Sequence, residues 1–176
     1  MRFLIMVACS LILACAPAAA ADPSGVWLVE DKSAQIEIES CSGILWGINN
    51  WERTPGRDTE NPDAALRGRP TLGIPILLGM RPVVQQRPEG PQTVWHGQIY
   101  NARNGRTYEA SIRLVNSDVL HLEGCVLGGL FCGGQNWTRI KGTAAQQGNA
   151  GAAVRGGGAP AGGVCSRVPD LARGTH

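Results

Sequence analysis

The feature that most constrains the fold is a run of alternating apolar and polar residues that begins just after an Asn104-Gly105 pair. Over residues 107–114 every second residue is apolar, and a period of two predicts a β-strand with one buried and one solvated face. The apolar members are Tyr108, Ala110, Ile112 and Leu114. Asn-Gly is a strong signal for a two-residue type I′ turn, in which both central residues need a positive φ. Because residues 95–100 alternate as well, residues 95–115 predict a β-hairpin.

Further short strands are predicted on both sides of this hairpin. They cover residues 25–29, 35–40, 44–51, 72–80, 119–124 and 135–140. Residues 81–92 contain several prolines, which donate no hydrogen bond to a sheet, so a loop is predicted there. About eight short strands with closely spaced turns predict an all-β fold, either a small antiparallel barrel or a sandwich. A barrel of this strand number either fills its interior with side chains or holds one small ligand.

Residues 1–21 predict an export signal rather than part of the fold. Arg2 supplies a positive charge, residues 3–13 are mostly apolar, and the alanines at 18–21 suit a cleavage site. The apolar stretch is too short for an ordinary transmembrane helix, and no later segment is long and apolar enough to span a bilayer. The expected location is periplasmic or secreted. Processing as a lipoprotein at Cys15 is the alternative, because residues 12–15 loosely resemble such a site.

The remainder predicts one domain followed by a tail. Residues 22–141 carry the strand patterns, whereas residues 142–176 are rich in glycine and alanine. That composition offers too little apolar surface to offset the entropy of ordering, so the tail is expected to be disordered. The formal net charge is only +2, which argues against nucleic acid as a partner because its phosphates demand a basic surface.

Four cysteines follow the predicted leader, and an even number in an exported chain suggests disulfides. Cys125 and Cys132 bracket a short glycine-containing segment that can turn tightly, so a disulfide is predicted between them, with two buried thiols as the alternative. Cys41 then has only Cys165 available, and this pairing stays open because Cys165 lies in the predicted tail. No Cys-x-x-Cys or paired-histidine motif is present, so neither a metal nor another cofactor is expected.

A polar loop is predicted over residues 52–70, where Asp58, Asn61 and Asp63 lie close together in sequence. These side chains suit either a cation site or a turn that caps its own backbone. The turn is favoured because Asn or Asp beside proline commonly initiates one, so Asn61 and Asp63 are given a structural role.

No set of residues typical of an enzyme is evident. His96 and His121 both alternate with apolar neighbours and are expected on the solvated faces of strands. A binding protein fits better, with a small apolar or amphiphilic ligand held in the barrel by Trp46, Trp51, Trp95 and Tyr108. These aromatics would otherwise simply fill the core. The alternative function is a solid-cored interaction module for an envelope protein partner, using the loops at 52–70 and 81–92.

Several motifs together resemble the domain-of-unknown-function family 2147, which comprises small exported bacterial proteins. They are D-x-x-N-P-D at 58–63, L-R-x-R-P at 66–70, W-x-G-x-I-Y-x-x-x-x-G-x-T-Y at 95–108, G-C at 124–125 and W-T-R at 137–139. The resemblance implies a lipocalin-like, calycin-type β-barrel and no established activity. The chain departs from the family pattern at Trp46, where a second cysteine is common, at Gln98, and at residues 101–102.

A looser likeness to lipocalins supports the barrel. Gly25-x-Trp27 resembles their first-strand G-x-W motif, and Arg139 resembles the arginine of their last strand. The likeness implies that the Arg139 guanidinium packs over the Trp27 indole at the closed end of the barrel, a structural role.

Overall fold

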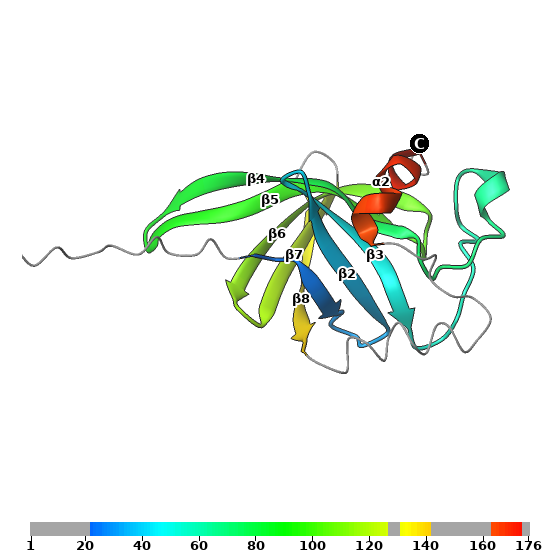
Figure 1. Cartoon of the computed structure of the whole chain (residues 1–176), viewed down its shortest axis with the longest axis horizontal. Helices are drawn as coiled ribbons and strands as arrows, with labels where there is room; N and C mark the ends of the chain where they lie inside the picture. Colours follow the sequence, from blue (N-terminus) through cyan, green and yellow to red (C-terminus); the bar gives the residue numbers. More distant parts are fainter. Residues whose placement is uncertain (1–21, 127–130, 142–162, 174–176) are drawn as a thin grey trace, which may run out of the picture.

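The protein, seen here as a computed structural model, is a closed antiparallel barrel of eight strands in sequence order (Figure 1). The structure describes residues 22–126, 131–141 and 163–173. The strands are β1 Gly25–Leu28, β2 Ala34–Cys41, β3 Ile44–Glu52, β4 Pro75–Arg87, β5 Gly90–Asn101, β6 Arg106–Asn116, β7 Val119–Val126 and β8 Phe131–Ile140. A 3-10 helix, η1 (Ala64–Leu66), lies between β3 and β4, and a helix, α2 (Val164–Arg173), follows the barrel. The predicted all-β barrel is confirmed, and the predicted leader lies outside the described residues.

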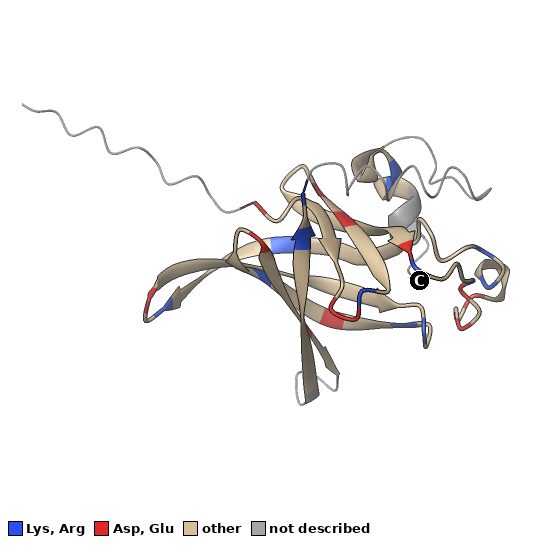
Figure 2. Cartoon of the chain, turned by 90° about the horizontal axis from the view of Figure 1, so that it is seen from below, with Lys and Arg blue, Asp and Glu red and all other residues tan. Residues whose placement is uncertain are grey.

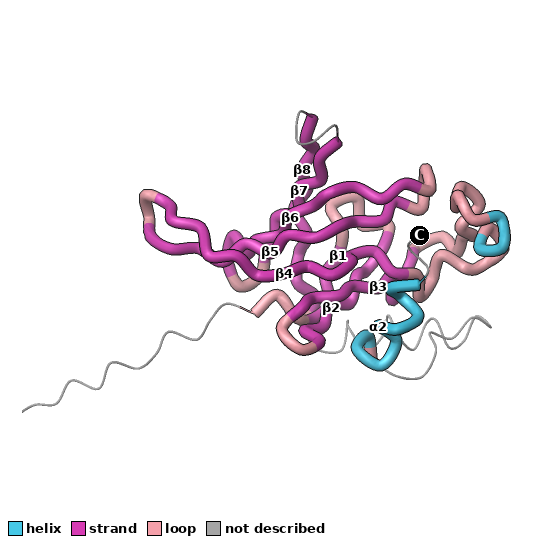
Figure 3. Tube along the Cα trace, turned by 90° about the horizontal axis from the view of Figure 1, so that it is seen from above, coloured by secondary structure: helices cyan, strands magenta, loops and turns pink. Residues whose placement is uncertain are grey.

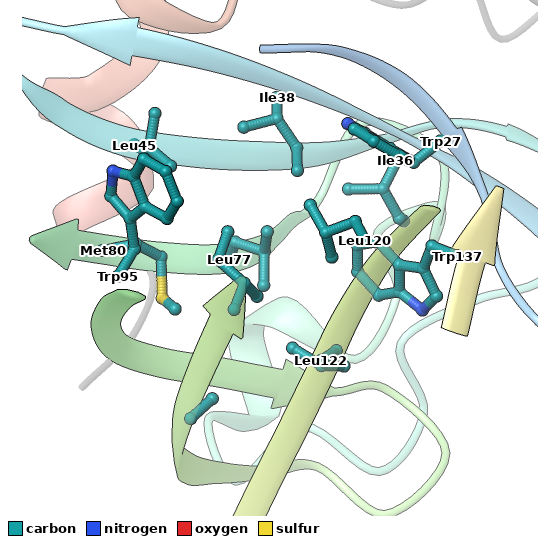
Figure 4. Packing of buried hydrophobic residues seen from close by; sticks show 12 residues of the cluster. Trp27, Ile36, Ile38, Leu45, Leu77, Met80, Trp95, Leu120, Leu122 and Trp137 are labelled. Atoms are coloured by element: carbon teal, nitrogen blue, oxygen red, sulfur yellow. The ribbon is translucent and has the colours of Figure 1, made fainter. Parts of the chain in front are cut away.

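Alternation places one face of each strand inside the barrel. On β6, Ala110 and Ile112 are buried, as the period of two predicted, and Tyr108 and Leu114 point to the same side. Ala110 and Ile112 belong to a core cluster that includes Ile36 of β2 and Trp137 of β8, and Leu114 packs against it (Figure 4). Full burial of one such side chain stabilises the fold by roughly 1.5–3 kcal/mol, so this shared interior is the main reason that the sheet closes.

One end of the barrel is plugged by Trp27 and Arg139, which are paired across β1 and β8. The Arg139 guanidinium carbon lies 4.1 Å from the centroid of the Trp27 ring, and Trp27 is fully buried. Arg139 also donates to the backbone carbonyls of Asp22, Ser24 and Ser117. These bonds tie the residues just before β1 to the β6–β7 turn, so this is the closed end.

The loop predicted at residues 81–92 is wrong, because β4 and β5 continue there as a two-stranded arm that extends beyond the barrel (Figure 1). Among the described residues, β4 pairs only with β5 past Met80, and the first residues of β5 pair only with β4. No described strand therefore pairs with either outer edge of the arm. Pro82 and Pro91 are tolerated because a strand with a free edge need not donate on both sides.

The turn that joins β5 to β6 is not the predicted type I′ turn. Four residues separate the strands, and of these only Gly105 has a positive φ, at 67°. The backbone N–H groups of Asn104 and Gly105 both donate to the Asn101 carbonyl. A Cβ on Gly105 would overlap the Glu60 carbonyl oxygen, so the turn packs directly against the loop before η1.

Helix α2 lies within the range that composition predicted to be disordered. It packs on the outside of β2 and β3 (Figure 3). Its first residue, Val164, is fully buried against Ile48. Cys165 forms a disulfide with Cys41 at the end of β2, with the two Cα atoms 5.3 Å apart. The disulfide, the buried Val164 side chain and hydrogen bonds from Cys165 N–H to Glu39 and from Arg167 to the Gly73 carbonyl thus attach a segment whose composition alone predicts no fold. Residues 142–162 lie outside the described part of the chain.

The predicted Cys125–Cys132 disulfide is confirmed. It joins β7 to β8, with the two Cα atoms 4.1 Å apart and directly paired across the two strands. Its position fixes β7 and β8 together near the end of the barrel opposite Arg139.

Within the described residues, no helix has the length and apolar character needed to cross a membrane. Positive and negative residues are interspersed over the strands and loops, and both signs occur in the loop between β3 and β4 (Figure 2).

Candidate ligand-binding cavity

A cavity of about 620 Å³ opens at the end of the barrel opposite the Trp27–Arg139 plug. This volume falls within the roughly 300–1,000 Å³ that is typical of small-molecule sites. Its mouth is formed by the β1–β2 turn, the long loop after β3 and the β5–β6 turn. One closed end and one open end give the barrel the form of a cup.

The inner wall of the cavity is apolar. It is formed by side chains from five different strands: Ile36, Ile76, Ile99, Leu122 and Trp137. Ile36, Leu122 and Trp137 are also members of the buried core. The floor of the cavity is therefore the side of that core that faces the open end of the barrel. An apolar part of a ligand would be removed from water here, which is favourable by about 25 cal/mol per Å² of apolar area.

The rim is polar, and one ion pair crosses it. Arg103 Nη2, on the β5–β6 turn, lies 2.8 Å from Asp31 Oδ2, on the β1–β2 turn. The closed strand order places these two turns on opposite sides of the barrel, so the pair spans the mouth. Hydrogen bonds from the Ser33 hydroxyl and backbone N–H, with a further contribution from Arg103, lower the pKa of Asp31 to about 2. Both partners are largely exposed, so the pair contributes little to stability.

Glu52 holds the long loop at the rim. Its carboxylate accepts hydrogen bonds from Asn49 Nδ2 at 3.1 Å, Thr71 Oγ1 at 2.7 Å and the Gly56 N–H at 3.1 Å. Asn49 Nδ2 also donates to the Thr71 carbonyl at 3.0 Å. Both sides of the loop are thereby attached to the end of β3, which positions the rim residues that the loop supplies.

Two buried polar atoms belong to residues of the cavity wall and have no hydrogen-bond partner among the described residues. They are the indole Nε1 of Trp137, a donor, and the amide Oδ1 of Asn49, an acceptor. An unsatisfied buried polar atom costs roughly 1–3 kcal/mol. A polar group bound against either atom would recover part of that cost.

A buried polar cluster attaches the same loop to the outside of β5. Asp58 is fully buried, and its carboxylate accepts from Tyr100 Oη at 2.6 Å, Asn61 Nδ2 at 2.8 Å and Arg69 Nε at 2.9 Å. Burial, followed by the hydrogen bond to Asp58, raises the pKa of Tyr100 to about 12. Nearby, Asn61 Oδ1 accepts from the Asp63 N–H, and Asp63 Oδ1 accepts from the Ala65 N–H at the start of η1. These contacts are structural, and they leave Asp58 fully occupied by protein donors.

The four aromatics predicted to bind a ligand are not brought together. Tyr108 lines the cavity, where its hydroxyl accepts from Asn104 Nδ2 at 2.7 Å. Trp95 lies deeper, in the buried core cluster. Trp46 packs with the cluster under α2, and the half-buried Trp51 is not part of the cavity wall as far as the structure describes it.

The residues that do form the cavity wall are less conspicuous in the sequence than the four aromatics. Ile36 and Ile99 lie in the predicted strands 35–40 and 95–100, in which apolar and polar residues alternate, and this alternation could have identified them as inward-facing. The rim residues Arg53 and Arg103 lie in turns, and nothing in the local pattern indicates that the two turns meet across the mouth.

The histidines and cysteines of the described barrel strands do not line the cavity. His96 is exposed on the arm side, with Nε2 3.1 Å from Gln85 Nε2, and His121 Nδ1 lies 2.9 Å from Asn136 Oδ1. Two groups of cysteines and glutamates come close together, Glu39 with Cys41 and Cys165, and Glu123 with Cys125 and Cys132. In each group the two sulfurs are joined in a disulfide, so neither sulfur is a thiolate ligand.

Comparison with known proteins agrees with this architecture. A solved structure described as protein HP1028 from the human pathogen Helicobacter pylori, belonging to the lipocalin family, superposes with a TM-score of 0.62 at 19% sequence identity. The match covers 73% of this chain and 90% of that chain, and it establishes the likeness of fold. Comparison with curated proteins gives no match. The bacterial family described as "Uncharacterized protein conserved in bacteria (DUF2147)" matches residues 25–139, and the chain therefore belongs to this family.

Proposed function

We propose that the protein binds a small apolar or amphiphilic molecule in the open end of its barrel. The observation that carries this proposal is the cavity of about 620 Å³, with an apolar floor and a polar rim. Pockets of this kind, mostly apolar with a few convergent polar groups, are the usual form of small-molecule sites. The lipocalin-like fold is compatible with such a ligand, although a fold alone does not define a function.

We further propose that the protein works outside the cytoplasm, in the periplasm or as a secreted protein. Two disulfides support this location, since such bonds persist mainly in oxidising compartments. Export by an ordinary signal peptide and lipid attachment at Cys15 both lead to that environment.

A cavity-filling variant tests the binding proposal. Gly124 lines the cavity, and a Cβ there would meet Ile99 at 3.8 Å, an ordinary contact, so Gly124→Leu places a side chain into the space. The matched control is Gly68→Leu, because a Cβ at Gly68 meets nothing within 4 Å. Binding of the neutral fluorescent probe N-phenyl-1-naphthylamine should be lost in Gly124→Leu and kept in the control. Equal probe binding by both variants would contradict the proposal.

The alternative is an interaction module for an envelope protein, and one observation favours it. The arm of β4 and β5 exposes Val83 and Val84, at 47% and 63%, beside two strand edges with which no described strand pairs. Native mass spectrometry of protein purified from the periplasm separates the two functions. A co-purified small molecule supports the cavity, whereas an empty protein that also binds no probe supports the arm.

A further inference from the structure

We infer that the ligand of this cavity is an amphiphile with an anionic head group, and that Arg103 binds that head group at the mouth. The inference rests on the proposed function and adds the ligand class and the residue that selects it. The inferred ligand class follows from the hydrogen bonds that the charged residues of the rim already make within the protein.

The two carboxylates that line the cavity are each engaged by three protein donors. Asp31 accepts from the hydroxyl and backbone N–H of Ser33 and from Arg103. Glu52 accepts from Asn49, Thr71 and Gly56. A cationic head group would have to displace donors that hold the turn and the loop, so the rim offers it no ready partner.

The two arginines of the rim have donors to spare. A guanidinium carries five N–H groups. Within the described residues, the side chain of Arg103 donates only through Nη2 to Asp31, and that of Arg53 only through Nη2 to the carbonyls of Asp31 and Lys32. Among the charged groups of the rim, the free hydrogen-bonding capacity is therefore cationic and donating, which suits a carboxylate, sulfate or phosphate head.

The position of Arg103 fits the depth of the apolar floor. Arg103, on the β5–β6 turn, lines the same cavity as Leu122 and Trp137, so an alkyl or ring portion seated against Leu122 and Trp137 can direct its polar end toward Arg103. Entry requires the Arg103–Asp31 pair to open, because the pair spans the mouth. Exposed ion pairs contribute little, so a head group that replaces Asp31 as the partner of Arg103 opens the mouth at low cost.

The test compares three amphiphiles with unbranched alkyl chains of nearly equal length and different head groups: dodecanoate, dodecanol and dodecyltrimethylammonium. Their dissociation constants are measured by displacement of N-phenyl-1-naphthylamine from the full chain at low salt. We expect dodecanoate to bind about three- to tenfold more tightly than dodecanol, the range for a partly exposed charge-assisted contact. Dodecyltrimethylammonium is expected to bind more weakly than dodecanol.

Variants of the rim identify the residue responsible. Arg103→Gln should remove the preference for dodecanoate, so that the ratio of the dodecanoate and dodecanol dissociation constants falls to about one. Arg106→Gln is the matched control, because Arg106 follows the same turn but does not line the cavity. Asp31→Asn should strengthen dodecanoate binding about twofold by freeing Arg103, whereas Asp118→Asn, the same charge change at the closed end, should not.

The outcomes separate the two proposals. Equal binding of dodecanoate and dodecanol, or a preference that survives Arg103→Gln, overturns the inference about the head group and leaves the binding function standing. Failure of all three probes to bind overturns the proposed function itself. Loss of the preference at high salt in the unaltered protein, with dodecanol binding constant, supports the electrostatic origin.

Discussion

Gly105 shows how much one residue contributes to this fold. It combines a positive φ with close contact between its backbone and the Glu60 carbonyl. Gly105→Ala should lower the free energy of unfolding by about 2–4 kcal/mol, because it introduces both conformational strain and a steric overlap. Urea unfolding measures the loss, with Gly68→Ala as a control that should stay within about 0.5 kcal/mol of the parent protein. A loss no larger than that of the control would show that the turn does not pack as described.

Trp27 and Arg139 should be energetically coupled. Their contact at 4.1 Å adds a cation–π term to the backbone hydrogen bonds of Arg139. A double-mutant cycle with Trp27→Ala and Arg139→Ala should give a coupling energy of about 0.5–2 kcal/mol in urea unfolding. Additive losses would mean that the two residues stabilise the closed end independently.

Tyr100 should make the free energy of unfolding fall at alkaline pH. Its pKa is raised to about 12 from an ordinary value of 10.0, so the folded state favours the neutral phenol. The associated stability is fully present below pH 10 and is lost as the pH rises toward 12. Tyr100→Phe should flatten the fall in unfolding free energy over this range, measured by urea unfolding at successive pH values. An unchanged pH profile would assign the alkaline loss to other groups.

At the scale of elements, α2 depends on one covalent bond. The Cys41–Cys165 disulfide joins residues 124 positions apart, and such a long loop predicts a stabilisation of roughly 4–5 kcal/mol in the chain-entropy picture. Cys165→Ser should release α2 while the barrel remains folded, because the strands pair without it. Hydrogen exchange of residues 164–173 should become fast, with the amides of β6 still protected.

The second disulfide supplies the comparison for that experiment. Cys125 and Cys132 are 7 positions apart, so Cys132→Ser should lower stability less than Cys165→Ser does. A larger loss from the shorter loop would mean that the bond between β7 and β8 acts on the folded state rather than on the unfolded chain.

These elements also show which parts of the fold the sequence could predict. Strands with one buried face, such as residues 107–114, were predictable because alternation is a local pattern that the core enforces. The arm was not, because its prolines indicate a loop unless the free edges of both strands are known. Helix α2 was not predictable from its composition, since its order comes from Cys41 and Ile48, far away in sequence.

In the candidate site, too, features that depend on a local sequence pattern were predictable, and features that depend on contacts between distant residues were not. Inward-facing residues such as Ile36 and Ile99 could be identified from their strands, whereas the meeting of Asp31 with Arg103 depends on how the barrel closes. Large aromatics were poor guides, because Trp95 fills the core and Trp46 packs outside the barrel.

At the scale of the whole molecule, a plugged end and an open end make ligand binding and stability interdependent. A molecule that binds only the folded barrel should raise the unfolding free energy by about 2.7 kcal/mol at a hundredfold excess over its dissociation constant. Dodecanol should therefore raise the melting temperature of the parent protein and of Gly68→Leu, but not that of Gly124→Leu. A uniform rise in all three would indicate binding outside the cavity.

The arm of β4 and β5 has a consequence for how the protein behaves in a crowded compartment. Two strand edges with which no described strand pairs, together with exposed valines, are an aggregation hazard, since each edge offers backbone N–H and C=O groups to a strand of another molecule. Pro82 and Pro91 stand on these edges, and proline is a common means of blocking strand addition. The same prolines that led the sequence to predict a loop here thus prevent strands of other molecules from adding to the arm. The double variant Pro82→Thr with Pro91→Thr should form thioflavin-positive aggregates under conditions in which the parent protein stays clear.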